Sequence, residues 1–330
     1  MKICFIERLE ADTPSIERVF DTLTTELRSR GVECVRQKLP YGNRFLDVLR
    51  NLLRFKPEPA DIYHIAGHIN YIALRLPPSK TIQTVHDLGI LDLRSGLRRK
   101  VLQWLFFKSP TRRARKTVAI SDATRGSLAN IANVDVQSIA VIPNPFPPGY
   151  ARRPKSLGQP PRVLQIGTAP HKNLERTASA LSGMKVHFRV IGRLSNAQRA
   201  HLENETPDHS NIEFVDDSSM MKEYEAADIV VFCSLFEGFG MPIIEAQAIG
   251  RPVVTSDRSP MKDVAGKGAV FVDPENIGSI RSGVERLLSN PEFMTELGEL
   301  GAENAGQYRV EAIAERYLEL YSGMMNGEKH

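Results

Sequence analysis

Short apolar runs rich in β-branched residues alternate with longer segments of helical periodicity along the whole chain. In the first half, the runs that predict strands are residues 2–6, 32–37, 62–65, 81–85, 117–120 and 139–142. In the second half they are residues 162–166, 187–191, 212–214, 229–233, 252–255 and 269–272. This alternation is typical of βαβ units, so each half predicts an α/β domain wound around a parallel sheet.

A cluster of prolines separates the two halves. Seven of the 21 prolines lie in residues 143–161, and proline-rich chain is stiff and avoids central strands, so we interpret it as a hinge. The predicted organisation is a domain over 1–145, a hinge over 146–161, a second domain over 162–308, and an amphipathic helix over 309–325. We expect that helix to pack back toward the first domain. Because ligands bind beyond the C-terminal ends of parallel strands, we also expect the domains to face each other across a cleft.

The composition is that of an ordinary globular protein, with 42% hydrophobic and 25% charged residues. No apolar run approaches the ~20 residues that a spanning helix needs. The N-terminus reads as an immediate strand rather than as a signal peptide. Cys4, Cys34 and Cys233 are odd in number and lie in apolar settings, which favours buried free thiols in a reducing compartment. We therefore expect a cytoplasmic protein.

The net charge of +4 conceals an asymmetry between the halves. Residues 1–150 hold 23 Lys and Arg against 14 Asp and Glu, whereas residues 151–330 hold 20 against 25. The run from Arg94 to Lys116 has nine basic residues, no acid and the apolar cluster WLFF. Two interpretations stay open. This run docks on an anionic surface, or it is an amphipathic helix with its apolar side in the core and its charges in water.

The candidate chemistry is concentrated in residues 235–254, LFEGFGMPIIEAQAIGRPVV. A glycine-rich turn follows a predicted strand and precedes a helix that begins near Pro242. The backbone amides of Gly238, Phe239 and Gly240 would point toward a ligand, and the helix dipole adds partial positive charge. A phosphate is the anion that this arrangement favours.

Two acids, Glu237 and Glu245, flank that turn. A carboxylate beside a phosphate would repel it, so each acid more plausibly accepts hydrogen bonds from neutral hydroxyl groups. A nucleotide sugar supplies such hydroxyls, from a ribose on one side of its diphosphate and a hexose on the other. The alternatives are that Glu245 only complements the helix dipole and that Glu237 is a solvated loop acid.

FEGFGMPIIEAQAIGRPVV followed by DVAGKGAVFVDP resembles the C-terminal signature of family 4 glycosyltransferases, which are retaining enzymes with the GT-B fold of two Rossmann-like domains. The family's two glutamates have seven residues between them, as Glu237 and Glu245 do. Further similar segments are TVHDL, VAISDATRGSL, VIPNPF, GTAPHKNLE and AADIVVFCS, in the family's order. The resemblance covers most of the chain. It is specific for fold and reaction class and weak for sugar identity.

The resemblance implies roles for individual residues. Glu245 would hold the ribose and Glu237 the transferred sugar, while Lys172 would neutralise the diphosphate and His86 would lie near the reacting carbon. The predicted catalytic residues are therefore His86, Glu237 and Lys172. The predicted donor-binding residues are Glu245, Gly238, Phe239, Gly240, Met241, Gly167, Thr168, His171 and Arg193.

For three of these residues, a structural or solvent-exposed role is the alternative. Lys172 is otherwise a solvated lysine near a helix start, Arg193 a surface arginine, and His86 a structural histidine. The sequence also departs from the family in one loop, because residues 7–15 contain no glycine and Ser15 stands where a glycine is usual. That loop would help to shape the phosphate and acceptor pocket.

The predicted function is retaining transfer of a hexose from a UDP- or GDP-sugar to a saccharide or lipid-linked acceptor, in cell-surface polysaccharide assembly. The first domain would be the acceptor side and the second would bind the nucleotide sugar. No Asp-X-Asp pair follows a strand, so we expect no metal and no other cofactor. We expect no nucleic-acid partner, and a peripheral contact with an anionic membrane through the run from Arg94 to Lys116. The rivals are a non-catalytic nucleotide-sugar-binding subunit and a nucleotide-sugar epimerase on the same scaffold.

Overall fold

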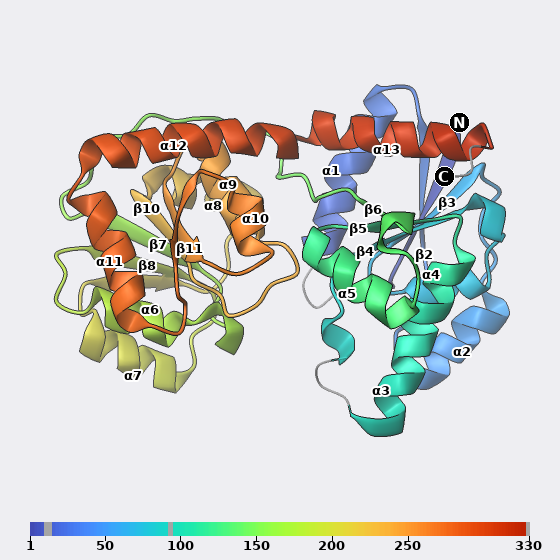
Figure 1. Cartoon of the computed structure of the whole chain (residues 1–330), viewed down its shortest axis with the longest axis horizontal. Coiled ribbons are helices and arrows are strands. Elements are labelled where there is room, and N and C mark those ends of the chain that lie inside the picture. The colour runs from blue at the N-terminus through green and yellow to red at the C-terminus, as the bar shows by residue number, and fades with distance from the viewer. Residues whose placement is uncertain (10–14, 92–94, 328–330) are drawn as a thin grey trace. The chain divides into compact units, whose positions relative to one another are not determined.

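The chain folds into two compact units in a computed structural model that describes residues 1–9, 15–91 and 95–327. Unit 1 comprises Met1–Pro148 together with the C-terminal segment from Arg309, and unit 2 comprises Gly149–Tyr308. Figure 1 shows a sheet covered by helices in each. The boundary at Pro148 falls inside the proline-rich segment. The middle of the loop that lacks glycine (residues 10–14) and Arg94 lie outside the described residues.

Unit 1 contains a six-stranded parallel sheet in the order β2-β1-β3-β4-β5-β6. Its strands are β1 (Lys2–Glu7), β2 (Glu33–Lys38), β3 (Ile62–Ala66), β4 (Thr81–Val85), β5 (Lys116–Ala119) and β6 (Ile139–Val141). Its α-helices are α1 (Ser15–Ser29), α2 (Phe45–Arg54), α3 (Gly96–Leu102), α4 (Ser109–Arg113), α5 (Asp122–Ala132) and α13 (Val310–Met325). A π-helical segment, η4 (Gln103–Lys108), joins α3 to α4, and a 3₁₀ turn, η1 (Asn70–Leu74), follows β3.

Unit 2 contains a second six-stranded parallel sheet, in the order β12-β11-β10-β7-β8-β9. Its strands are β7 (Arg162–Ile166), β8 (His187–Ile191), β9 (His209–Ile212), β10 (Ile229–Phe232), β11 (Val253–Ser256) and β12 (Ala269–Val272). Its α-helices are α6 (Leu174–Leu181), α7 (Asn196–Glu205), α8 (Asp217–Ala226), α9 (Met241–Ile249), α10 (Met261–Ala265), α11 (Ile277–Leu288) and α12 (Pro291–Ala305). This strand order is that of the Rossmann fold, so the predicted α/β class with two Rossmann-like sheets is confirmed.

One strand prediction was wrong in its position. The apolar pattern placed a strand at residues 212–214, but β9 ends at Ile212 and Phe214 is 81% exposed. The physical reason is that β9 lies at the edge of the sheet, where its four residues HSNI are only half-buried. A strand that buries little carries little hydrophobic signal.

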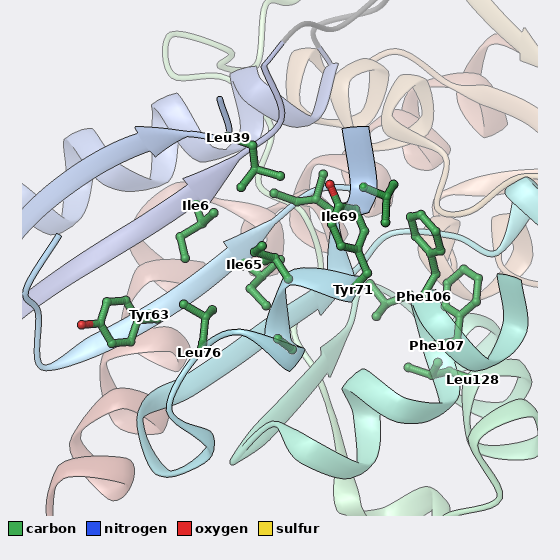
Figure 2. Close-up of a cluster of buried hydrophobic side chains, with 14 of the residues drawn as sticks. Ile6, Leu39, Tyr63, Ile65, Ile69, Tyr71, Leu76, Phe106, Phe107 and Leu128 are labelled. Atoms are coloured by element: carbon green, nitrogen blue, oxygen red, sulfur yellow. The ribbon is translucent and has the colours of Figure 1, made fainter. Parts of the chain in front are cut away.

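The core of unit 1 fills the space between the sheet and the segments that follow β3 and precede β5 (Figure 2). Tyr71 of η1 contacts Phe106 of η4 edge to face, with ring centroids 5.1 Å apart. The fully buried Asn51 of α2 donates to the Tyr71 hydroxyl at 2.9 Å and to the Tyr41 carbonyl at 3.0 Å. Burial of that amide is tolerated because its donors are satisfied.

A buried polar chain fixes α13 within unit 1. His64 of β3 is fully buried, and its Nδ1 lies 2.6 Å from the Tyr321 hydroxyl while its Nε2 lies 2.8 Å from Thr84 Oγ1. The Tyr317 hydroxyl lies 3.1 Å from the same Thr84 oxygen. These bonds connect two strands with the C-terminal helix, which also packs against α1 (Figure 1).

The run from Arg94 to Lys116 forms α3, η4 and α4 over its described part. Phe106 and Phe107 enter the core, as the amphipathic-helix interpretation requires. Leu97, Val101 and Trp104 nevertheless remain 77%, 46% and 55% exposed. Core packing therefore accounts for only part of the apolar content of this segment.

Candidate functional site

The predicted donor-side residues of unit 2 gather where β7 and β10 lie side by side. The chain leaves β7 toward β8 and leaves β10 toward β11, so the strand order reverses between these two strands. Ligands of open α/β sheets bind at such a switch point, beyond the carboxyl ends of the strands. The loop after β7 carries Gly167 to Lys172, and the loop after β10 carries Glu237 to Gly240.

Lys172 and Glu237 meet at this point. The Lys172 Nζ donates to Glu237 Oε1 at 2.6 Å, and the two side chains are 20% and 13% exposed. The same ammonium lies 4.7 Å from the centroid of the Phe232 ring. A carboxylate and an aromatic face therefore hold one cation in place at the edge of the sheet. The structure brings together the two residues whose roles the resemblance linked.

His171 lies on the same carboxylate. Its Nε2 is 4.0 Å from Glu237 Oε1, and its ring stacks on Phe236 at a centroid distance of 4.8 Å. Burial lowers the pKa of His171, Glu237 opposes that shift, and Lys172 adds to it. His171 is therefore neutral at pH 7 and offers a hydrogen bond rather than a second positive charge.

Two glycines leave space for the side chains of the loop after β7. Gly167 has φ +92°, and a Cβ there would lie 3.0 Å from Cγ and Cε of Lys172. Gly192, at the end of β8, has φ +134°, and a Cβ there would lie 2.9 Å from Cγ2 of Thr168. Thr168 Oγ1 in turn donates to the backbone carbonyl of Arg193 at 2.6 Å, and the Arg193 side chain is exposed. A Cβ at Gly167 would therefore press on the Lys172 side chain, which would have to shift by a few tenths of an ångström.

Hydrogen bonds connect the loop after β7 with the loop after β10. Asn173, with φ +61° and 2% exposure, donates to the carbonyls of Cys233 and Pro274 at 3.0 and 2.6 Å. The amide of Leu235 donates to the His171 carbonyl at 2.8 Å. Lys172 and Glu237 therefore project from segments that share a rigid backbone.

Two buried polar atoms near these loops have no hydrogen-bond partner within the described residues. They are Oε1 of Gln165, in β7, and Oγ of Ser234, just after β10. Gln165 donates its amide to the Lys172 carbonyl at 3.1 Å. Unsatisfied buried groups are uncommon in proteins and are often functional. Sequence reasoning missed both residues, although a polar residue near the end of an apolar strand is a visible signal.

Helix α9 presents its N-terminus after Gly240, which has φ +116°. Met241 is the first helical residue and is half-buried, as is Gly238. Phe239 is only 4% exposed and its ring contacts Tyr308 with centroids 5.7 Å apart, so its side chain is taken up by packing within the unit. The amides of the first helical turn and the helix dipole favour an anion here.

Glu245 lies one turn into α9. Its Oε2 accepts a hydrogen bond from the Tyr224 hydroxyl at 2.6 Å. Burial raises the pKa of Tyr224 well above its ordinary value, and the Glu245 carboxylate raises it further, so the hydroxyl stays a donor. Tyr224 was absent from the sequence-based site because it is far from Glu245 along the chain.

In unit 1, His86 follows β4 and is 5% exposed. Its ring stacks on His68, with centroids 6.4 Å apart and an interplanar angle of 14°. His86 Nε2 has no hydrogen-bond partner among the residues described. His68 Nε2 lies 3.4 Å from Asp87 Oδ2, and Asp87 Oδ1 accepts from the Gly89 amide at 2.8 Å. Asp87 thus supports both the neighbouring turn and His68.

Burial keeps His86 neutral. The pKa of His86 is lowered to about 3, mainly by burial and further by His68, while Asp87 and Glu17 oppose the shift. Glu17 makes a bidentate pair with Arg8, at 2.6 and 3.0 Å. Sequence reasoning missed Arg8 and His68, which follow β1 and β3, the pair of strands between which the order of this sheet reverses.

The described residues contain no group of three or more His, Cys, Asp or Glu placed to hold a metal ion. Over the same part of the chain, no helix has the length and hydropathy needed to cross a bilayer. The three cysteines are free and buried, as predicted.

Family models match the two units in order along the chain. Residues 27–149 match the model described as Glycosyltransferase Family 4, and residues 151–304 match that of the glycosyl transferases group 1. The chain belongs to the family 4 glycosyltransferases. The resemblance that the sequence motifs indicated is thereby confirmed.

Proteins of this family and of this fold are similar to the chain at low sequence identity. The O-antigen chain mannosyltransferase RfbU of Salmonella typhimurium is 28% identical over 225 residues, which are 64% of this chain and 62% of that protein. This chain thus spans less than two thirds of that relative. Sucrose-phosphate synthase (tll1590) from Thermosynechococcus elongatus superposes with a TM-score of 0.83 at 17% identity, over 99% of this chain and all of the other.

A third similar protein is Anabaena Alr3699/HepE, whose structure in complex with UDP-glucose superposes with a TM-score of 0.76 at 16% identity. The superposition covers 98% of this chain and all of the Anabaena chain. At such identities the likeness shows the fold alone, and that fold is the predicted GT-B fold.

Acidification is expected to destabilise unit 1. Burial lowers the pKa of both His64 and His86 from 6.5 to about 3. Between those values the unfolded chain binds two protons that the folded unit does not, so stability falls as the pH falls. The slope is at most ~1.4 kcal/mol per pH unit for each histidine. Urea unfolding between pH 6.5 and 5, followed by fluorescence of Trp104, the chain's one tryptophan, measures it.

The variant His86→Gln serves as the comparison for this slope, because it removes one of the two titrating groups and keeps a polar side chain. Its slope should be about half that of the parent protein. A slope that is the same in both proteins would show that His86 does not remain neutral in the folded state.

Proposed function

We propose that this protein transfers a hexose from a UDP- or GDP-sugar to a saccharide or lipid-linked acceptor, with retention of anomeric configuration. One observation carries the proposal: the Lys172 ammonium is fixed by Glu237 at the β7–β10 switch point, in loops bound to each other. This is the place where a doubly wound sheet binds a nucleotide.

Lys172 is the group that we assign to the diphosphate. An ammonium close to the departing phosphate stabilises the charge that develops as the glycosidic bond breaks. The N-terminus of α9, reached through Gly240, contributes its partial positive charge to the same task. These two features supply the charge that a metal ion supplies in other nucleotide-sugar enzymes, so we propose that the reaction needs no metal.

Glu237 and Glu245 are assigned to hydroxyl groups rather than to phosphates. Glu237 touches Lys172, so its carboxylate can orient a hydroxyl of the transferred sugar next to the diphosphate. Glu245 is held in place by the Tyr224 hydroxyl, and we assign it to the ribose. Charge-assisted hydrogen bonds to hydroxyls are stronger than neutral ones, which makes carboxylates effective sugar ligands.

The proposed chemistry is substitution on one face of the sugar. The acceptor oxygen bonds to the anomeric carbon, the bond from that carbon to the diphosphate oxygen breaks, and the acceptor proton passes to the departing diphosphate. The protein supplies charge stabilisation and proximity. His86 of unit 1 is neutral, so we assign it no proton transfer in this step.

Similar proteins support the proposed setting. An O-antigen mannosyltransferase and a protein crystallised with UDP-glucose are among the similar proteins, which supports polysaccharide assembly and a UDP- or GDP-hexose donor. The three buried free thiols suit a reducing compartment, so we place the reaction in the cytoplasm. A contact of the segment from Ser95 to Lys116 with an anionic membrane would suit a lipid-linked acceptor.

The ribose assignment predicts a specific loss in Glu245→Gln. We expect UDP affinity to fall about tenfold, because one charge-assisted hydrogen bond is lost. We expect a smaller fall for 2′-deoxy-UDP, because the partner hydroxyl is already absent, and the difference between the two is the coupling energy. Calorimetric titration measures both affinities, with Glu203→Gln on the exposed face of α7 as the control.

Turnover separates the transferase from its rivals. The parent protein should slowly release UDP from UDP-glucose, or GDP from GDP-mannose, and Glu245→Gln should release less. Binding without release would favour a non-catalytic subunit, and conversion to another nucleotide sugar would identify an epimerase. If Glu245→Gln lost the same affinity for UDP and for 2′-deoxy-UDP, the ribose assignment would be refuted, but the transferase proposal would not.

A second prediction concerns Gly167, which lies next to the Lys172 side chain. Gly167→Ala should weaken UDP binding and turnover about tenfold, because its Cβ presses on the methylene carbons of Lys172 and shifts the side chain that carries the ammonium. The matched control is Gly183→Ala, since Gly183 also has positive φ, +73°, but has nothing within 4 Å of an added Cβ. Both variants should lose roughly 1–2 kcal/mol of stability from the left-handed backbone. If Gly183→Ala weakened UDP binding equally, the effect would be strain and not the position of Lys172.

A further inference from the structure

Helix α2 carries an apolar stripe that the fold leaves exposed. Phe45, Leu46, Leu49 and Leu53 are 70%, 63%, 42% and 77% exposed. Their spacing places them within about 100° of the helix circumference. Single exposed apolar residues are ordinary, but four on one stripe mark an interaction surface.

The other side of α2 already anchors it to unit 1. Val48, Asn51 and Phe55 are buried, at 4%, 0% and 2% exposure. Asn51 makes the hydrogen bond to the Tyr71 hydroxyl described above. The exposed stripe is therefore not needed to hold the helix in place, and its presence calls for an external partner.

A second exposed stripe lies on α3 and η4. Leu97, Val101 and Trp104 follow each other at helical spacing and are 77%, 46% and 55% exposed. Phe106 and Phe107 of the same segment point into the core beside Tyr71 (Figure 2). This segment therefore has one set of aromatic and aliphatic groups inside the unit and another outside it.

The two stripes belong to neighbouring elements. Both α2 and η4 pack against η1, where Tyr71 contacts Asn51 of α2 and Phe106 of η4. In Figure 1, α2 and α3 lie at the same end of unit 1. We call the exposed apolar residues of these elements the apolar–basic face; they are Phe45, Leu46, Leu49, Leu53, Leu97, Val101 and Trp104.

Basic residues are frequent in the segments that carry these apolar groups. Residues 44–56 contain four Lys or Arg and one acid, Asp47, and residues 95–116 contain eight Lys or Arg and no acid. A hollow of about 590 Å³ lies beside Trp104 and is lined by Lys108, Arg112 and Arg113. Arg112 and Arg113 donate to backbone carbonyls, at 2.9 and 3.1 Å, so these bonds leave their positive charge uncancelled.

We propose that the apolar–basic face docks on the surface of an anionic lipid bilayer. Leucine, phenylalanine and tryptophan side chains backed by Lys and Arg are the combination that binds the boundary between head groups and acyl chains. The basic hollow suits a lipid phosphate. Nucleic acid would use the charges but would leave the aliphatic side chains in water. The docking stands independently of the sugar chemistry, and only its use, access to a lipid-linked acceptor, rests on the proposed function.

Sedimentation of the full chain with vesicles tests the proposal. The protein should bind phosphatidylcholine vesicles that contain phosphatidylglycerol, bind pure phosphatidylcholine weakly, and be released by salt. Trp104 fluorescence should shift to the blue on binding. The double variant Leu53→Ser/Leu97→Ser, one change in each stripe, should lower partitioning roughly tenfold or more.

A matched control is Phe214→Ser, which removes an apolar side chain that is 81% exposed in unit 2 and should leave vesicle binding unchanged. Neutralising Arg98, Arg99 and Lys100 to glutamine should abolish the preference for anionic vesicles. UDP binding should be the same in all variants, which separates a failure of docking from a failure of the donor site.

Three results would overturn the proposal. One is vesicle binding by Leu53→Ser/Leu97→Ser equal to that of the parent protein. Another is a concentration-dependent dimer that the same double variant abolishes without any vesicle binding by the parent, which would assign the face to a second copy of the chain. The third is binding to RNA in place of vesicles.

Discussion

The proposed donor site in unit 2 depends on the parallel pairing of β7 with β10. That pairing brings the loop after β7 and the loop after β10 to one point at the edge of the sheet. There Lys172 contacts Glu237, which lies 65 residues later in the sequence. Every group assigned to the diphosphate or to the sugar is placed from there, either by a strand end or by the first turns of α9. Because all strands run the same way, the polar ends of their loops converge while the apolar strands build the core beneath them.

Backbone conformation turns this convergence into a usable site. Gly167 and Gly192 give the space that Lys172 and Thr168 occupy, and Asn173 joins the two loops through buried hydrogen bonds. A group that is positioned before the ligand arrives loses little freedom on binding, and charge stabilisation then costs little reorganisation at the moment of reaction. The rigid loops therefore hold the Lys172 ammonium in position before a ligand binds.

The sequence predicted the fold, and it marked residues that the structure places at the β7–β10 switch point, because strand periodicity and strand-end residues are local signals. It missed Tyr224, Arg8 and His68, whose importance comes from side chains that meet only in the folded chain. It misplaced β9, whose edge position removes the hydrophobic pattern. It detected the basic aromatic segment around Trp104 but not the exposed stripe of α2, because an amphipathic pattern does not reveal whether a face is already covered.

The most direct test of the account is the reactivity of Lys172. A lysine-acylating reagent, with sites followed by mass spectrometry, reports how accessible each amine is with and without saturating UDP. The account predicts that UDP slows acylation of Lys172 and leaves the exposed Lys185 of the same unit unaffected. Unchanged acylation of Lys172 in the presence of bound UDP would contradict the assignment of this ammonium to the diphosphate.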